Sequence, residues 1–170
     1  VRLQDGSIRK MSELQLNDMV WNGKDYEEVI GFSHADPDCF ATYLEIKTED
    51  NNKLHISPEH YLYANNELTL PKDVKVGDTV TTNKITKVSS IKKVILQGAY
   101  HPVTYSTDLV VDNILCSVKM GSSPIWSANI WIPIVYAFYK LNLPTKVKTG
   151  YYGKSMWHSI WNTYQKKIKT

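Results

Sequence analysis

The sequence predicts a mainly β domain that carries two amphipathic helices at its C-terminal end. Three observations support this fold class. Short segments of alternating polar and apolar residues, separated by turns rich in Gly, Asn and Asp, continue from residue 1 to about residue 118. One phrase occurs twice within this region. After residue 121 the composition changes to segments rich in Trp, Ile and Tyr with helical spacing.

The repeated phrase reads LQLNDMV at residues 14–20 and VKVGDTV at residues 74–80. Each copy precedes a β-rich stretch, at residues 28–32 and at residues 87–91. A repeat of this length predicts two similar β subdomains that fold onto each other. Chance is the alternative, because Asp-x-Val is a common way for a chain to turn into a strand.

A β-hairpin is predicted near the middle of the first half of the chain. Residues 43–48 alternate between polar and apolar side chains, residues 49–52 read EDNN, and residues 53–56 return as a second strand. Further short strands with Gly, Asn and Asp turns continue to Asn113. The region before residue 119 is therefore expected to be an all-β body.

Two helices are predicted after this body. The first covers residues 125–141, and Pro133 is expected to kink or break it because proline removes a backbone hydrogen bond. Residues 143–150 read as a linker, and Ser155 can cap the second helix. The apolar stripe of that helix consists of Met156, Ile160, Tyr164 and Ile168. No apolar run reaches the length of a transmembrane helix.

Composition limits the functional classes. The 170 residues have 42% hydrophobic and 22% charged content, which is ordinary for a globular fold, and a net charge of +3 does not indicate nucleic-acid binding. Lysines are concentrated towards the C-terminus, where they could contact anionic lipid or form a solvated helix face. The two cysteines make neither a disulfide framework nor a metal-ligand pattern. Because Val1 is not an initiator methionine, the chain is expected to be a fragment or a processed product.

The run Ile56-Ser57-Pro58-Glu59-His60 is the clearest candidate for chemistry. A hydroxyl and an imidazole three residues apart can both reach one peptide bond. The alternative is that His60 is a structural histidine with satisfied hydrogen bonds, as most single histidines are.

The chain resembles the autoprocessing domain of hedgehog-type proteins, the Hint module that is shared with inteins. The segments that carry this resemblance are residues 1–6, 28–34, 57–60, 98–104 and 109–113. The resemblance implies a Hint-type β fold with pseudo-two-fold symmetry over residues 1–118. It also implies that residues 119–170 are a helical region similar to the sterol-recognition region of those proteins.

The resemblance assigns roles to three residues. His60 would protonate the departing amine as a general acid, and Ser57 would donate a hydrogen bond to the developing oxyanion. His34 stands where hedgehog-type domains often carry an Asp that deprotonates the attacking sterol hydroxyl. A neutral imidazole can act as this base, so the acceptor stays open between a sterol, another alcohol and water. The alternative for His34 is a histidine in a turn at a strand end.

The resemblance also exposes a missing nucleophile. Such domains begin with a Cys that attacks the preceding carbonyl, and the matching position would lie a few residues before Val1. Cys39 and Cys116 cannot replace it, because the bond to be cut must precede the attacking residue. The chain as written is therefore expected to be inactive in the first step. Intein-type splicing is not expected, because Ile114 follows Asn113 and the chain continues.

The expected reaction is self-cleavage through a thioester, followed by transfer of the N-terminal product to a hydroxyl acceptor of the cholesterol type. The expected partners are a sterol or other lipid alcohol, an N-terminal cargo domain of the same precursor and a membrane surface; no cofactor, metal or nucleic acid is expected. The expected location is the secretory pathway, at the endoplasmic reticulum, or the extracellular space. Candidate sterol-binding residues are Trp126, Trp131, Trp157 and Trp161, which could instead pack on the β body. The alternative function is a catalytically inactive Hint-fold binding or structural module.

Overall fold

The computed structural model describes residues 1–143, except residues 82 and 123. This part of the chain is mainly β, as the sequence predicts, and one of the two predicted helices lies within it. The strands are β1 (Met19–Trp21), β2 (Tyr26–Glu28), β3 (Gly31–Thr48), β4 (Lys53–Ile56), β5 (His60–Ala64), β6 (Glu67–Thr69), β7 (Thr79–Thr81), β8 (Ile85–Val103), β9 (Asp108–Val111) and β10 (Ile114–Met120). The helical elements are the 3-10 turns η1 (Met11–Glu13) and η2 (Ile125–Ser127) and the α-helix α1 (Ala128–Lys140).

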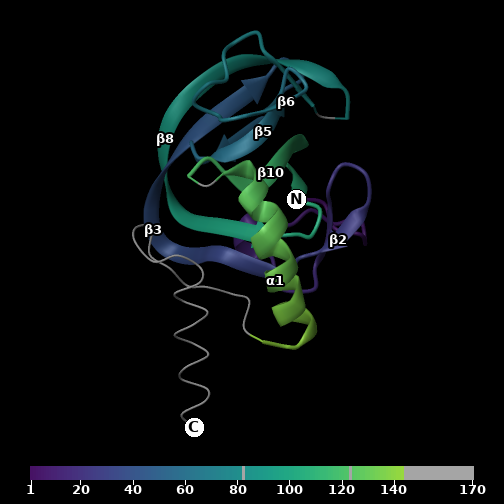
Figure 1. The fold of residues 1–170 in the computed structure, drawn as a ribbon. Helices are drawn as coiled ribbons and strands as arrows, with labels where there is room; N and C mark the ends of the chain where they lie inside the picture. Colours follow the sequence, from purple (N-terminus) through teal and green to yellow (C-terminus); the bar gives the residue numbers. More distant parts are fainter. Residues whose placement is uncertain (82, 123, 144–170) are drawn as a thin grey trace.

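Two long strands form the frame of the molecule. β3 and β8 pair antiparallel from Gly31 opposite Val103 to Thr48 opposite Val88. The ladder curls around the rest of the sheet (Figure 1), and its register shifts at irregularities such as the one between Phe32 and His34. Bulges of this kind bend a strand and increase its twist. The sheet order is β4-β3-β8-β7-β5-β10-β9 with β6 on β5, while β1 and β2 form a separate pair.

The repeated phrase forms the same turn twice. In the first copy the Gln15 N–H donates to the Asp18 carboxylate at 2.7 Å, and in the second the Lys75 N–H donates to the Asp78 carboxylate at 2.8 Å. The residue before each aspartate has a positive φ, which suits the Asn and Gly found there. After each turn the aspartate carbonyl accepts a backbone bond from a buried valine, Val29 or Val88. The two copies of the phrase therefore adopt the same local structure.

Three clusters of buried side chains make up the core. The first surrounds Leu62 and Ile46 between β3, β5 and β10. The second joins the start of the chain to β9 through Val1, Phe32 and Leu109. The third lies under α1.

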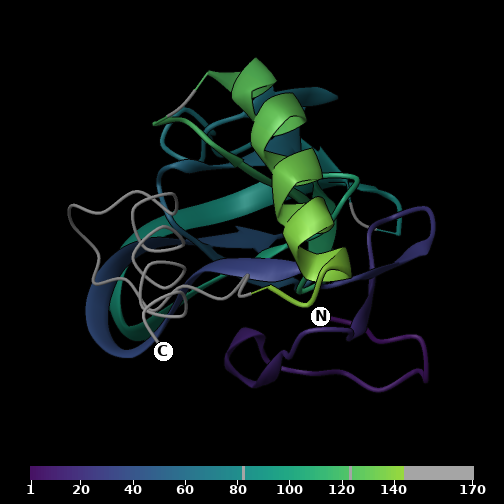
Figure 2. The same ribbon diagram turned by 60° about the horizontal axis from the view of Figure 1, so that its bottom comes forward.

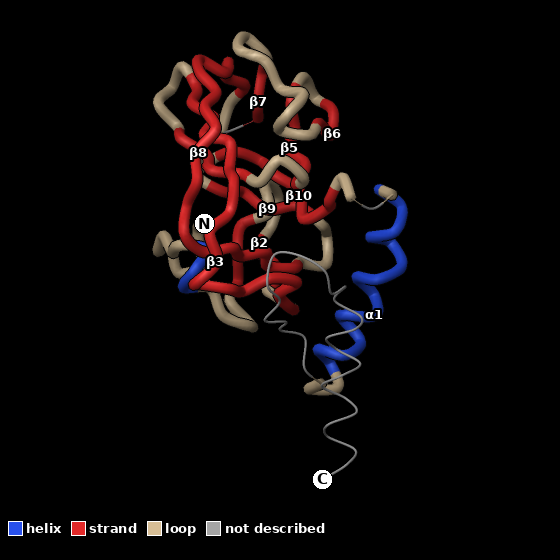
Figure 3. The backbone as a smooth tube through the Cα atoms, turned by 90° about the vertical axis from the view of Figure 1, so that its left-hand side faces the viewer, coloured by secondary structure: helices blue, strands red, loops and turns tan. Residues whose placement is uncertain are grey.

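Helix α1 covers one side of the β body (Figures 2 and 3). It buries Ala128, Ile132 and Val135 in a cluster that also holds Ile30, Val103 and Val118 of the body. The helix continues through Pro133, so of the kink or break that was predicted there the break does not occur. One lost backbone bond is offset by the packing of the turns on either side. The second predicted helix lies outside the described residues. None of the described helices has the length and apolar character needed to cross a membrane.

The packing of α1 gives a stability prediction. The side chain of Ile132 is 2% exposed, whereas that of Ile130, which lies on a different face of the helix, is 56% exposed. Ile132→Ala is expected to lower the free energy of unfolding by about 2–5 kcal/mol, because it removes buried methyl groups and leaves a cavity. The matched control Ile130→Ala is expected to change it by no more than about 0.5 kcal/mol. Urea unfolding followed by circular dichroism measures both, and equal losses would contradict the packing described for α1.

Candidate functional site

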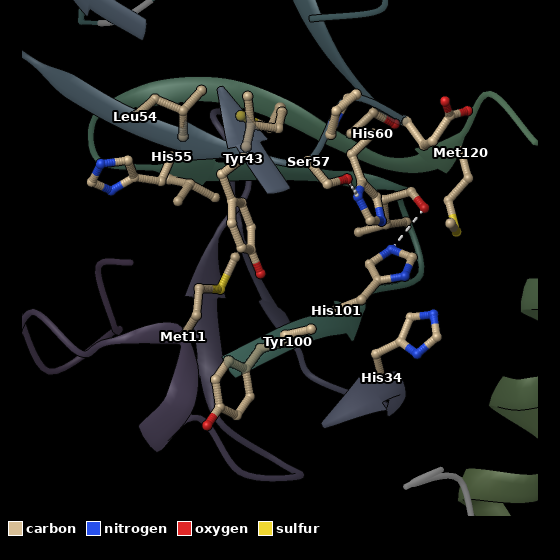
Figure 4. Close-up of a pocket in the computed structure, with 18 of the residues that line it drawn as sticks. Met11, His34, Tyr43, Leu54, His55, Ser57, His60, Tyr100, His101 and Met120 are labelled. Carbon is tan, nitrogen blue, oxygen red and sulfur yellow. Dashed lines mark hydrogen bonds between the residues drawn. The ribbon is translucent and has the colours of Figure 1, made fainter. Parts of the chain in front are cut away.

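A cavity of about 710 Å³ opens within the curled sheet. Figure 4 shows His60, His101 and His34 in succession on one side of it, and Tyr43 and His55 towards the other. Apolar residues make up much of the remaining wall, namely Met11, Leu54, Ile56, Leu109, Val111 and Met120. The cavity therefore combines an apolar wall with a cluster of three imidazoles.

Ser57 and His60 lie side by side in this wall. The turn that joins β4 to β5 is closed by a backbone bond from the His60 N–H to the Ser57 carbonyl at 3.3 Å. This turn brings the Ser57 hydroxyl oxygen to 2.5 Å from Nδ1 of His60. The contact is local in sequence, and it places both predicted side chains at one point of the cavity.

The environment of His60 keeps its imidazole neutral. Burial, followed by the nearby His34 imidazole, lowers the pKa of His60 from 6.5 to about 4. The Nε2 atom of His60 is the one buried side-chain nitrogen or oxygen of the described residues that has no hydrogen-bond partner. A buried nitrogen without a hydrogen-bond partner lowers the stability of the fold. Its presence in this wall indicates that another molecule or segment binds there.

His34 enters the same wall from β3. It stands opposite His101 of β8, and Phe32 stands opposite Pro102, so Ser33 is an extra residue in the ladder. This bulge directs both Ser33 and His34 towards His101: the Ser33 hydroxyl is hydrogen-bonded to Nδ1 of His101, and His34 lines the cavity beside it. The turn alternative for His34 is wrong, since the residue lies within a strand.

His101 is a site residue that the sequence did not indicate. Its side chain is 5% exposed, and its ring centroid lies 4.2 Å from that of His60 in an edge-to-face arrangement. No spacing along the chain signals this contact, because it depends on the pairing of β8 with β3 and on the position of β5. Among the described residues, no group of three His, Cys, Asp or Glu side chains is arranged to hold a metal ion.

Neither cysteine has the environment of an activated nucleophile. Cys116 is buried and lines the cavity, and burial raises the pKa of its thiol. Burial also raises the pKa of Cys39, with the nearby Asp36 adding to the effect. Both side chains therefore stay protonated at neutral pH, whereas a thiolate is the nucleophilic form.

The predicted sterol-binding tryptophans do not share one place. Trp126 is 62% exposed, and Trp131 packs against the cluster under α1. Neither belongs to the cavity wall. Trp157 and Trp161 lie outside the described residues.

Comparison with known families decides which family this is. The sequence model of the Hint module family matches residues 1–119. The chain belongs to the Hint module family. This confirms the resemblance inferred from the sequence and the Hint-type fold that it implied. The match ends at residue 119, within β10.

Two nematode proteins are similar to this Hint module. Warthog protein 1 of Caenorhabditis elegans is 28% identical over 124 residues, which cover 64% of this chain and 26% of that protein. Warthog protein 6 of the same organism is 29% identical over 134 residues, which cover 69% of this chain and 22% of that protein. The chain thus spans about a quarter of the length of these relatives.

Several solved structures of inteins have a similar fold. A variant of the gp41-1 intein has a TM-score of 0.60 at 18% identity and covers 69% of this chain and 92% of its own. A DnaB intein from Synechocystis has a TM-score of 0.57 at 10% identity, with coverage of 69% and 92%. At these identities the likeness shows the fold alone. The Hint module described here therefore has an intein-like fold.

Proposed function

We propose that this Hint module cleaves a peptide bond that precedes it in a longer precursor and transfers the N-terminal product to a hydroxyl acceptor. The observation that supports this most is the Ser57–His60 pair in the cavity, together with the unpartnered Nε2 of His60. A substrate peptide group beside this imidazole would give Nε2 the partner that the described residues do not provide. The proposal extends the family's autocatalytic chemistry to the residues of this chain.

The first step is an acyl shift from nitrogen to sulfur. The sulfur of an upstream cysteine attacks the preceding carbonyl carbon, the C–N bond breaks, and a thioester forms. The proton of the attacking thiol passes to His60, which delivers it to the departing amine. With a pKa of about 4, the His60 imidazolium is a strong donor as soon as it forms. Ser57 donates a hydrogen bond to the carbonyl oxygen while negative charge develops there.

The second step transfers the acyl group. The oxygen of an alcohol attacks the thioester carbonyl, the C–S bond breaks, and the thiol is regenerated. His34 takes the proton of the alcohol as a general base. Its place in the same wall as His60 supports this role, because both imidazoles must reach one carbonyl carbon.

The cysteine itself is proposed to lie on a segment before Val1. The side chain of Val1 is buried in a cluster with Leu109, and Met11 and Val111 pack against the same cluster. These last three residues also line the cavity. A segment that continues before Val1 would therefore start beside the cavity.

The acceptor is proposed to be a sterol or another lipid alcohol, and the cargo a domain that precedes the Hint module in its precursor. The apolar cavity wall suits an acceptor with an apolar body. The exposed Trp126 and the lysine-rich C-terminal residues suit contact with a membrane surface. This chemistry fits a precursor in the secretory pathway or outside the cell.

Thiol-induced cleavage tests the proposal. A precursor that carries the natural segment before Val1 is incubated with dithiothreitol, and release of the N-terminal part is followed by gel electrophoresis. Cleavage at a cysteine shortly before Val1 is expected. If the natural segment holds no cysteine, or if the precursor stays intact, the inactive binding or structural module is the better account.

Ser57 gives a smaller, graded prediction. Ser57→Ala is expected to slow thiol-induced cleavage about tenfold, because one oxyanion donor is lost while backbone donors remain. Ser57→Thr keeps the hydroxyl and serves as the matched control, with a rate close to that of the native protein. Equal rates for the alanine and threonine variants would remove Ser57 from the mechanism.

A further inference from the structure

The second imidazole of the cavity wall, His101, has no part in the reaction proposed above. Its ring meets the His60 ring edge to face, with an interplanar angle of 69° and 4.2 Å between centroids. Figure 4 shows the His101 ring directly beside that of His60, on the side away from the Ser57 hydroxyl. His60 is thus held between a hydroxyl on one side and an aromatic ring on the other.

The hydrogen bonds of His101 fix both its position and its tautomer. Nε2 lies 2.9 Å from the Val118 carbonyl oxygen in β10. Because a carbonyl only accepts, Nε2 must carry the proton. In the neutral ring Nδ1 is then an acceptor, and the Ser33 hydroxyl donates to it. His101 therefore ties β8 to β10 and to the bulge of β3, and its ring has a single orientation.

The charge state of His101 agrees with this geometry. Burial, then His60 and then His34, lower its pKa well below the usual value, against a smaller opposing effect of the Val118 carbonyl. The other charged or titratable groups of the cavity wall are Glu59, His55, Lys93, Cys116 and the two tyrosines Tyr43 and Tyr100. At neutral pH the His101 ring beside His60 is thus uncharged.

We propose that His101 is a positioning residue for His60: its anchored ring holds the His60 imidazole in place against Ser57 and keeps water away from it. The inference rests on the proposed function only for its effect on cleavage. The contact itself can be tested on the chain as it stands.

The decisive measurement is an NMR titration of the His60 imidazole. In the native chain the pKa of His60 is expected at about 4, against an ordinary value of 6.5. His101→Gln can keep a donor for the Val118 carbonyl but removes the ring, so the pKa of His60 is expected to rise towards 6.5. His101→Phe keeps a ring but loses the hydrogen bonds to Ser33 and Val118, so the pKa of His60 is expected to rise by clearly less than in His101→Gln.

Two further variants complete the test. His55→Gln changes a histidine that pairs with Glu45 at 3.1 Å, and it is expected to leave the titration of His60 unchanged. Ser33→Ala releases Nδ1 of His101, so it is expected to move the pKa of His60 in the same direction as His101→Gln, by less. If His101→Gln does not fold, Ser33→Ala decides in its place. A native titration of His60 in a folded His101→Gln or Ser33→Ala variant would overturn the proposal, and so would equal shifts in the Gln and Phe variants.

Cleavage supplies the functional readout. In a precursor with the upstream cysteine, His101→Gln is expected to slow thiol-induced cleavage about tenfold and to displace its pH profile upward, whereas His101→Phe is expected to retain most of the rate. A His101→Gln precursor with the native rate and the native profile would overturn the positioning role. A native precursor that does not cleave at all would instead count against the proposed function and leave the titration as the test of His101.

Discussion

His60→Ala is expected to slow thiol-induced cleavage of the precursor by about a hundredfold or more, the usual range for loss of one general acid. The expectation follows from the position of the imidazole, with Ser57 on Nδ1 and no partner on the buried Nε2. Without it the departing amine must take its proton from solvent, from which the buried site is shielded. The rate is measured from the fraction of precursor cleaved over time in dithiothreitol.

A matched histidine variant separates chemistry from stability. His55→Ala removes an imidazole that is bound to the Glu45 carboxylate, and it is expected to reduce the rate far less than His60→Ala. Circular dichroism shows whether both variants keep the native fold. Cleavage at the native rate in a folded His60→Ala precursor would remove His60 from the mechanism.

His34→Ala is expected to separate the two steps of the reaction. Transfer to a sterol should fall by about a hundredfold or more, because the alcohol loses its general base. Thiol-induced cleavage should persist, since dithiothreitol needs no such base. Its pH profile should move slightly upward, because His34 contributes to the low pKa of His60 and this contribution is lost.

His34→Asp is the corresponding rescue. A carboxylate can take the same proton, so part of the sterol transfer should return. Its negative charge also favours the imidazolium form of His60, so the pKa of His60 should rise above the native value of about 4. Transfer and thiol cleavage are measured side by side in detergent micelles, with and without sterol. Loss of both activities in His34→Ala would show that His34 is structural or acts in the first step.

The sequence was sufficient where structure depends on local patterns. The two turns at Asp18 and Asp78 use the same backbone bonds because the same residue types recur at the same spacing. The Ser57–His60 contact also follows from spacing, because a tight turn brings residues three apart together. The resemblance to the Hint family could be inferred only from the order of several such segments along the chain.

Features that depend on the pairing register of the strands could not be predicted from the sequence. His101 meets His60 and Ser33 only because β8 pairs with β3 at one register and a bulge adds Ser33 to the ladder. The continuity of α1 through Pro133 likewise depends on packing against Ile30 and Val118, which local propensity does not contain. Alternation of polar and apolar residues shows that a strand has two different faces. Which side chains each face contacts depends on the register with the partner strand.

The proposed chemistry depends most directly on a thioester at the bond before the upstream cysteine. Mass spectrometry of the N-terminal product, released from the precursor by hydroxylamine, tests this point. A C-terminal hydroxamate on the residue before that cysteine is the predicted product, and its yield should fall with His60→Ala. Release of a free carboxylate in the presence of hydroxylamine, or cleavage at another bond, would contradict the thioester and with it the roles assigned to Ser57, His60 and His34.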